Sequence, residues 1–311
     1  MGKRKWFMVM MMVILILTLA VGCGQQEGKE TPDEGENDPT NAAYPMTVTD
    51  AAGREVTLES RPGRIVSLMP SLTEISFALE AGDRVVGVTT YCDYPAEATT
   101  KDQVGDLFNL NTEKILSLEP DLVLVGKSET LQQSLSFLED AGVAYFVVDP
   151  QTLDEIEGSI IQVAEIIDAK EIGESLVASL QVDRAALEAK VAAIPADERA
   201  NVFVLIDTDA LYTVGEGEFV SEMIATAGGN NLAAALGSSY FQVSEEAFFE
   251  LNPEILINTW PMRDQVLAKD AWKDLAAVKN DKVFDVNGSV VTRPGPRYVQ
   301  GLEELYRVFT E

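Results

Sequence analysis

Histidine is absent from the 311 residues of this sequence, and cysteine occurs only twice. Without an imidazole the chain cannot form a Ser-His-Asp or Cys-His catalytic arrangement, and it offers a metal no imidazole ligand. No other catalytic constellation is evident, so we expect a protein that is not an enzyme and has no catalytic residue, cofactor or bound metal. One alternative is an enzyme with a two-lobed α/β fold. Another is a metal site formed by carboxylates alone, which the many Asp and Glu residues leave open.

Positive charge is also scarce. Lys and Arg number 23 against 51 Asp and Glu, which gives a net charge of −28. Because cationic side chains supply most of the affinity for a nucleic-acid backbone, this balance argues against nucleic acid as a partner. The apolar content of 46% is nevertheless enough for a globular protein with a substantial core.

The apolar run at the N-terminus is too short to cross a membrane comfortably. It covers residues 6–20 and follows three basic residues at positions 3–5. A transmembrane helix is the alternative, but this pattern favours a signal peptide, which we place at residues 1–23. The residues AVGC at 20–23 resemble the bacterial lipobox, with Ala20 where Leu is commoner. We therefore expect Cys23 to carry lipid and the protein to be extracytoplasmic and anchored to the cell membrane.

Residues 24–43 are rich in Glu, Asp, Gly, Pro and Thr and show no apolar period, which predicts a disordered acidic tether. Once Cys23 is lipidated, Cys92 is the only remaining thiol. We expect Cys92 to be a small buried hydrophobic residue.

From residue 44 onward, short apolar runs alternate with amphipathic helical stretches, after a predicted hairpin at 47–56. This alternation predicts an α/β fold with two Rossmann-like lobes and mainly parallel sheets. A stretch of about 23 residues without Pro predicts one long helix, about 35 Å long, that bridges the lobes. We place the N-terminal lobe at 44–170, the bridging helix at 171–194 and the C-terminal lobe at 195–311. The predicted buried strands are 64–68, 85–89, 122–125, 145–148, 202–206, 255–258 and 282–286.

A helix–turn–strand unit occurs twice. NTEKILSLEPDLVLV begins at Asn111, and SEEAFFELNPEILIN begins 133 positions later at Ser244. We expect both first residues to cap a helix, with Glu113 and Glu246 in its first turn and a proline ending it. A second pair, SLTEISFALEAG and SEMIATAGG, predicts an apolar helix followed by a C′ glycine in each lobe. The repetition indicates a duplication across the two lobes.

Aromatic and polar residues gather where predicted strands end and helices begin. Ligands of open α/β sheets bind outside the carboxyl ends of the strands, so these residues are candidates for a binding site. They are Pro70, Ser71, Tyr91, Leu107, Phe108, Tyr240, Trp260 and Arg293.

Several segments resemble the substrate-binding lipoproteins of ABC importers for cobalamin, siderophores and haem. They include GVTTYCDYPAEA, LYTVGEGEFVSEMIATAGGNNL and RPGPRYVQGLEELYRVF, and the first and last are most similar to the cobalamin-binding branch. The resemblance implies two lobes bridged by one helix, a ligand between them and little hinge motion. It also implies a monomer that docks on a permease, which works with its ATPase, through one surface Glu per lobe; Glu113 and Glu246 match those positions.

The same resemblance places Tyr91, Tyr240 and Arg293 in the ligand cleft, with Leu107 where an aromatic residue is common. A corrin ring is broad and mostly apolar with amide edges, which suits aromatic faces and a few polar groups. We therefore expect a cobalamin-like corrinoid. A ferric siderophore or haem is the alternative: Tyr91 or Tyr240 offers an axial ligand for haem, whereas an anionic siderophore needs several cations and only Arg293 and Arg297 are evident.

Overall fold

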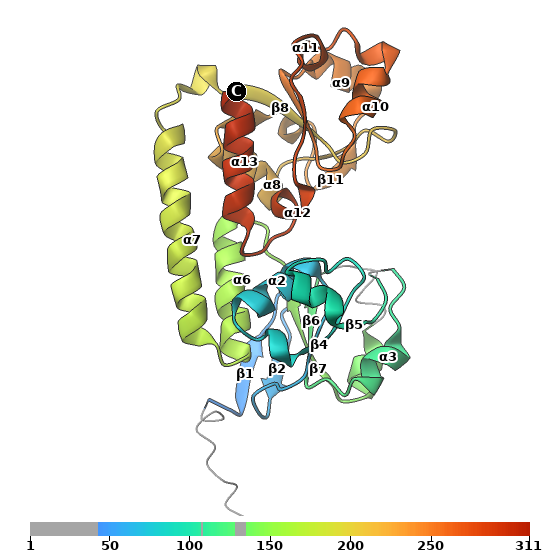
Figure 1. Ribbon diagram of the computed structural model, residues 1–311, viewed down its shortest axis with the longest axis vertical. Coiled ribbons are helices and arrows are strands. Elements are labelled where there is room, and N and C mark those ends of the chain that lie inside the picture. Colours follow the sequence, from blue (N-terminus) through green and yellow to red (C-terminus); the bar gives the residue numbers. More distant parts are fainter. Residues whose placement is uncertain (1–42, 107, 128–134) are drawn as a thin grey trace, which may run out of the picture. The chain divides into compact units, whose positions relative to one another are not determined.

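The computed structural model describes residues 43–106, 108–127 and 135–311. The expected signal peptide, the lipidation site Cys23, the tether up to residue 42 and Leu107 lie outside the described residues. Residues 43–311 form one compact unit, and its strands build two separate parallel sheets (Figure 1). No helix in the described part of the chain is long and apolar enough to cross a membrane.

The first lobe contains the expected hairpin and a five-stranded parallel sheet in the order β5-β4-β3-β6-β7. Strands β3 and β6 are buried along their whole length, as in a parallel sheet that is covered on both faces. The strands are β1 (Met46–Thr49), β2 (Glu55–Leu58), β3 (Ile65–Ser67), β4 (Val85–Val88), β5 (Asp102–Gln103), β6 (Leu122–Gly126) and β7 (Ala144–Val148). The helices are α2 (Pro70–Ala78), α3 (Thr112–Ser117) and α5 (Ser136–Asp140).

The second lobe contains a four-stranded parallel sheet in the order β10-β8-β12-β13 and an antiparallel pair, β9 with β11. The strands are β8 (Ala200–Leu205), β9 (Tyr212–Val214), β10 (Gly229–Asn231), β11 (Tyr240–Gln242), β12 (Ile255–Asn258) and β13 (Val283–Asp285). The helices are α8 (Phe219–Thr226), α9 (Glu245–Leu251), α10 (Arg263–Ala268), α11 (Ala276–Lys279), α12 (Gly288–Val291) and α13 (Tyr298–Thr310). The order matches β4-β3-β6-β7 of the first sheet, which confirms the predicted α/β fold with two Rossmann-like lobes.

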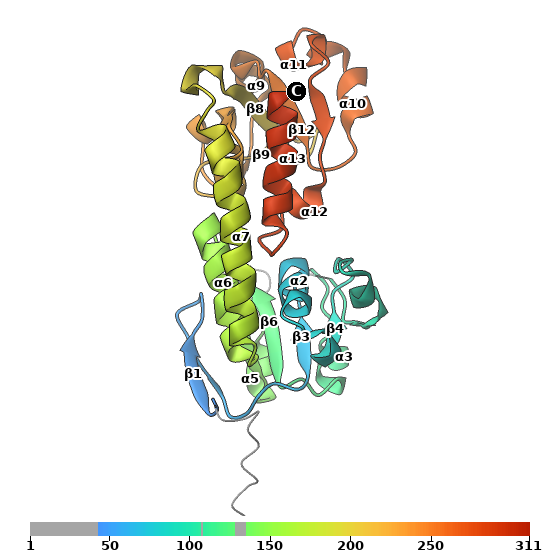
Figure 2. The ribbon, with the colours of Figure 1, turned by 60° about the vertical axis from the view of Figure 1, so that its left-hand side comes forward.

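Two consecutive helices, α6 (Leu153–Ile166) and α7 (Lys170–Val191), connect the sheets. Helix α7 packs against α6 and against α13, so it touches both lobes (Figure 2). Gly173 permits the close approach of α6 and α7, because a Cβ there would lie 2.4 Å from the Cβ of Ala164. The long bridging helix that the sequence predicts is thus present as α7, with 22 residues.

A buried carboxylate joins three of these helices. Glu157 of α6 accepts hydrogen bonds from the Tyr298 hydroxyl of α13 at 2.5 Å and from the Gln181 amide of α7 at 2.8 Å. Arg184 of α7 forms an ion pair with the same carboxylate at 3.3 Å. Burial, followed by the hydrogen bond to Glu157, raises the pKa of Tyr298 above its usual range. These bonds supply the partners that a buried charge requires.

The repeated unit has the same local structure in both lobes. Asn111 and Ser244 accept hydrogen bonds from backbone N–H groups at the starts of α3 and α9, so both expected caps are present. The residues before the two prolines, Glu119 and Asn252, both adopt the left-handed conformation, with φ of 46° and 42°.

The acid that follows each proline binds the neighbouring strand. Asp121 accepts N–H groups of Gly63 and Arg64, just before β3, at 2.8 Å. Glu254 accepts the N–H of Asn201, at the start of β8, also at 2.8 Å. Each repeated unit therefore holds its own strand, β6 or β12, beside the neighbouring strand, β3 or β8.

The second pair of repeated helices, α2 and α8, is predicted to be followed by a C′ glycine in each lobe. This prediction is correct for α8 only. Gly228 follows α8 with a φ of 92°, but after α2 the left-handed residue is Glu80, with a φ of 57°. Helix α2 ends at Ala78, and the N–H of Ala81 bonds back to Ser76, so the left-handed residue lies two positions before Gly82. Gly82 has a different role, because a Cβ there would lie 2.6 Å from the ring of Phe77.

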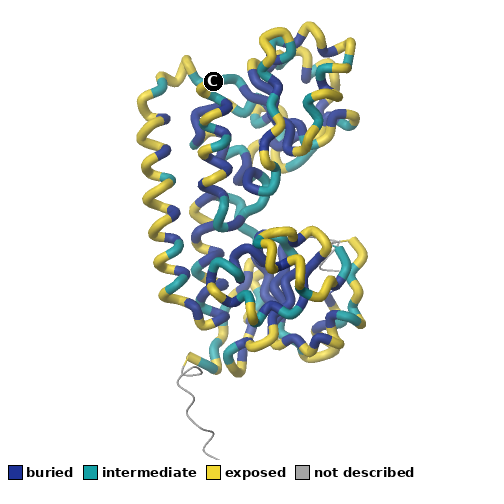
Figure 3. The backbone as a smooth tube through the Cα atoms, viewed as in Figure 1, coloured by how far each residue is buried: buried dark blue, intermediate teal, exposed yellow. Residues whose placement is uncertain are grey.

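One apolar cluster extends through both lobes. Its buried members include Ile65 in the first sheet, Ile160 and Leu180 on the connecting helices, and Ile257 and Leu305 in the second lobe. Figure 3 shows these buried segments inside each lobe and along α6 and α13. The lobes therefore share part of their core.

Candidate functional site

The carboxyl ends of three strands of the first sheet, together with segments of the second lobe, border a hollow of about 150 Å³, which we call the interlobe hollow. In the first lobe, its lining follows β3, β6 and β7; in the second, it comes from the start of α8, from β11 and from the turn at Pro294. This is the location that the general rule for open α/β sheets predicts. The lining residues are Met69, Ser71, Leu72, Gly126, Lys127, Val148, Asp149, Pro150, Gln151, Glu218, Phe219, Tyr240 and Pro294.

A second hollow of about 240 Å³ lies at the carboxyl ends of β12 and β13, and we call it the β12 hollow. Trp260 lines it and is 64% exposed, so much of the residue is accessible. The Thr259 hydroxyl is buried and has no hydrogen-bond partner among the described residues. The other lining residues are Pro261, Val286, Asn287, Gly288, Ser289, Thr292 and Arg293.

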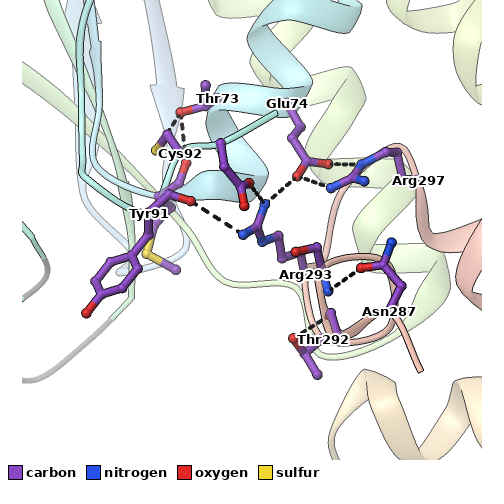
Figure 4. Close-up of polar contacts among 12 residues, drawn as sticks. Thr73, Glu74, Tyr91, Cys92, Asn287, Thr292, Arg293 and Arg297 are labelled. Carbon is purple, nitrogen blue, oxygen red and sulfur yellow. Dashed lines mark hydrogen bonds and ion pairs between the residues drawn. The ribbon is translucent and has the colours of Figure 1, made fainter. Parts of the chain in front are cut away.

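Between the hollows, two arginines of the second lobe meet a carboxylate of the first (Figure 4). Glu74 on α2 accepts two hydrogen bonds from Arg297, at 2.8 and 2.6 Å, and one from Arg293 at 3.1 Å. The Glu74 side chain is only 1% exposed. The ring of Tyr94 lies 4.0 Å from the Arg297 guanidinium, and this cation–π contact further stabilises the position of Arg297.

Arg293 makes further contacts with the loop that follows β4. It forms an ion pair with Asp93 at 2.6 Å and donates to the Tyr91 carbonyl at 3.4 Å. The bond from Arg293 lowers the pKa of the Asp93 carboxyl below its usual range. Although burial alone lowers the pKa of Arg293, its bonds to Asp93 and Glu74 outweigh burial and raise it. Arg293 therefore stays charged and compensated.

The structure places five of the expected site residues on or beside these features. Ser71 and Tyr240 line the interlobe hollow, whereas Trp260 and Arg293 line the β12 hollow. Tyr91 touches Arg293 through its carbonyl, and its side chain is 49% exposed. Burial, with a smaller contribution from Glu218, raises the pKa of the Tyr240 phenol.

Two other expected residues line neither hollow. Pro70 is the first residue of α2, where its fixed φ and missing N–H suit a helix start. Phe108 is 74% exposed, and its backbone N–H binds Asp106.

The docking residues expected from the resemblance, Glu113 and Glu246, are exposed in the first turns of α3 and α9. Neither carboxylate has a hydrogen-bond or ion-pair partner in the part of the chain that the structure describes. Both side chains are thus accessible to another protein.

Sequence reasoning missed Glu74 and Asp93. Glu74 is the only charged residue in the apolar helix PSLTEISFA, a pattern that indicates a buried acid in need of a cationic partner. Asp93 lies between two tyrosines in the YCDYP segment and carries no comparable signal. Its partner Arg293 is 200 positions away.

Cys92 is 4% exposed, as the sequence predicts, and lies in a small apolar cluster with Val85 and Val88. Its sulfur also accepts a hydrogen bond from Thr73 at 3.1 Å. Within residues 43–106, 108–127 and 135–311, no group of three or more Cys, Asp or Glu side chains is placed to hold a metal ion.

Comparisons with known proteins all indicate the same family. The model of the periplasmic binding protein family matches residues 65–289. The chain is 36% identical to YvrC of Bacillus subtilis, named an uncharacterized ABC transporter substrate-binding lipoprotein, over 94% of this chain and 93% of that one.

Two solved structures have the same fold. The periplasmic vitamin B12-binding protein BtuF of Vibrio cholerae is 28% identical, with a TM-score of 0.72 over 80% of this chain and 97% of that one. The periplasmic heme-binding protein RhuT of Roseiflexus is 30% identical, with a TM-score of 0.70 over 79% and 97%. These relatives are solute-binding proteins and not enzymes. The chain therefore belongs to the periplasmic binding protein family and is the substrate-binding protein of an ABC transporter.

Proposed function

We propose that this protein captures a cobalamin-like corrinoid between its two lobes and delivers it to the permease of an ABC importer. The observation that carries the proposal is the pair of exposed aromatic side chains, Tyr91 and Trp260, on opposite lobes. Arg293 bonds the Tyr91 carbonyl and lines the same hollow as Trp260. Flat aromatic faces suit a broad, mostly apolar ring, and they bind it at a low cost in side-chain entropy.

Polar groups at the hollows match the amide edge of a corrin. Ser71 lines the interlobe hollow and Thr259 lines the β12 hollow, and each side chain carries a hydroxyl. Each hollow is smaller than the roughly 300–1,000 Å³ of a typical small-molecule pocket. We propose that the ring extends across both hollows and the aromatic side chains at their rims.

A ferric siderophore or haem is the second candidate, because a relative of the same fold is named a heme-binding protein. The exposed Tyr91 phenol offers haem an axial ligand. Tyr240 is a poor candidate for that role, since burial raises its pKa and disfavours the phenolate.

We further propose that the protein is a monomer, anchored outside the cell membrane by lipid on Cys23, and that Glu113 and Glu246 dock it on the permease. An exposed, unpartnered carboxylate in each copy of the repeated unit supports this assignment. Such contacts determine orientation and register more than affinity.

The test is a titration of the purified full chain in detergent micelles, with empty micelles as the blank. Cyanocobalamin, cobinamide, haemin and a ferric siderophore are compared by heat and by Trp fluorescence. We expect tight one-to-one binding of a corrinoid, and about tenfold weaker binding for Trp260→Ala but not for Trp260→Phe. Binding of haemin or the siderophore with no response to either corrinoid would overturn the ligand assignment and leave the importer role intact.

A further inference from the structure

The cations at the proposed ligand site are all bound to carboxylates of the protein. Lys127 lies 2.9 Å from Asp149, Arg293 contacts Glu74 and Asp93, and Arg297 contacts Glu74. The two internal segments outside the described residues, 107 and 128–134, contain no Lys or Arg. Thus every described cation that lines either hollow already has a carboxylate partner.

Burial favours the ion pairs at Glu74 most strongly. The side chains of Glu74, Arg297 and Arg293 are 1%, 12% and 17% exposed. A carboxylate so completely removed from water requires its cationic partners, because an unpaired buried charge is strongly unfavourable. The guanidinium donors of Arg297 that point to Glu74 are thereby occupied.

Carboxylates also outnumber cations around the hollows. Glu218 and Asp149 line the interlobe hollow together with Lys127, and Glu74 and Asp93 lie beside Arg293 and Arg297. An anion entering this region meets negative charge from both lobes. A neutral amide-bearing ligand experiences no such repulsion.

We propose that Glu74 and Asp93 determine specificity: by compensating Arg293 and Arg297, they make the site accept ligands without net negative charge and reject anionic ones of the same shape. The inference rests on the proposed ligand site but not on the ligand's being a corrinoid. In this proposal, two carboxylates select neutral ligands over anionic chelates, and neither carboxylate needs to touch the ligand.

The first test compares two ligands of nearly the same shape. These are cyanocobalamin and its monocarboxylate, in which one side-chain amide is hydrolysed. For the unaltered full chain we expect the monocarboxylate to bind at least tenfold more weakly. In Asp93→Asn and in Glu74→Gln the ratio should fall below threefold, because Arg293 gains free donors. Glu250→Gln, an exposed acid on α9, makes the same change in charge and should leave the ratio unchanged.

The second test needs no corrinoid. Thermal unfolding is measured in citrate and in sodium chloride of equal ionic strength. We expect citrate to stabilise Asp93→Asn and Glu74→Gln, but neither the unaltered chain nor Glu250→Gln. Because Asp93 is 62% exposed, its variant should fold even if Glu74→Gln does not.

These outcomes separate the two proposals. If neither corrinoid binds, the ligand assignment fails, and the citrate measurement still decides the role of the carboxylates. The specificity role is wrong if citrate stabilises the unaltered chain as much as Asp93→Asn. It is also wrong if both corrinoids bind and every variant keeps the ratio of the unaltered chain.

Discussion

At the residue scale, Asp93 links the two lobes through a pH-sensitive contact. Its pKa is lowered by the hydrogen bond from Arg293, so the folded state binds its proton less readily than the unfolded state. The contact therefore stabilises the fold above about pH 4, the ordinary pKa of Asp, and this stabilisation disappears as the pH falls through the lower folded value.

We predict that Asp93→Asn lowers the free energy of unfolding at pH 7 and that its difference from the unaltered chain shrinks between pH 5 and pH 3. Chemical denaturation over this pH range measures the difference. The matched control is Asp197→Asn, an exposed acid with no ion-pair partner among the described residues. A difference that stays constant down to pH 3 would contradict this role of Asp93.

Residue types at strand ends could be predicted, whereas residue pairs across the site could not. Tyr91 and Trp260 follow apolar strands, and the general rule for parallel sheets locates such positions at the ligand edge. The bond between Glu74 and Arg297 spans 223 positions, and no local pattern specifies it. For this reason the sequence points to Arg293 as a ligand residue but not to Glu74 and Asp93, its partners in the structure.

At the element scale, the junction at Glu157 offers a test of how α6, α7 and α13 are held together. We predict that Tyr298→Phe lowers the free energy of unfolding by about 1.5–3 kcal/mol, because a buried hydrogen bond to a charged group is lost. Tyr306→Phe on the same helix is the control, since its hydroxyl has no hydrogen bond to another described residue.

The same variant gives a pH dependence of known sign. The folded pKa of Tyr298 is raised, so its contribution is complete below about pH 10, the ordinary Tyr value, and is lost as the pH rises through the folded value. The difference between Tyr298→Phe and the unaltered chain should therefore shrink above pH 10. A difference that grows there would show that Tyr298 ionises more readily in the fold.

The elements themselves were largely predictable, because apolar periods, caps and prolines are local signals. Strand β12 has the predicted bounds, and the caps Asn111 and Ser244 make the expected bonds. The error at the end of α2 arose because Glu80 adopts a conformation that usually favours glycine. Gly82 is instead required by packing against Phe77, which no sequence period displays.

At the scale of the whole molecule, the proposed docking through both lobes gives the next prediction. The double variant Glu113→Ala with Glu246→Ala should bind the permease complex of its importer about 2- to 30-fold more weakly, as expected for two exposed ion pairs. Ligand affinity should not change. Binding to the permease in nanodiscs at low salt measures the effect, which should decrease as salt is added.

A control for this experiment removes the same charge elsewhere. Glu171 on α7 and Glu250 on α9 are exposed, and Glu171→Ala with Glu250→Ala should leave permease binding unchanged. If both double variants weaken binding equally, general charge and not the repeated unit directs docking.

The two-lobed arrangement could be predicted from the alternation of strands and helices and from the duplicated unit. The contact between the lobes could not. Ile65 and Leu305 belong to one apolar cluster although they lie in different lobes, and their sequence contexts predict only that each is buried.

That shared cluster means that the duplicated chain does not contain two independent proteins. Cutting it between the repeats would leave each half with an apolar face that the other half normally covers, and a lone buried Glu157 or Tyr298 without its partner. Such halves lack the burial needed to stay folded and tend to associate. We therefore expect the two lobes to unfold together, in one cooperative transition.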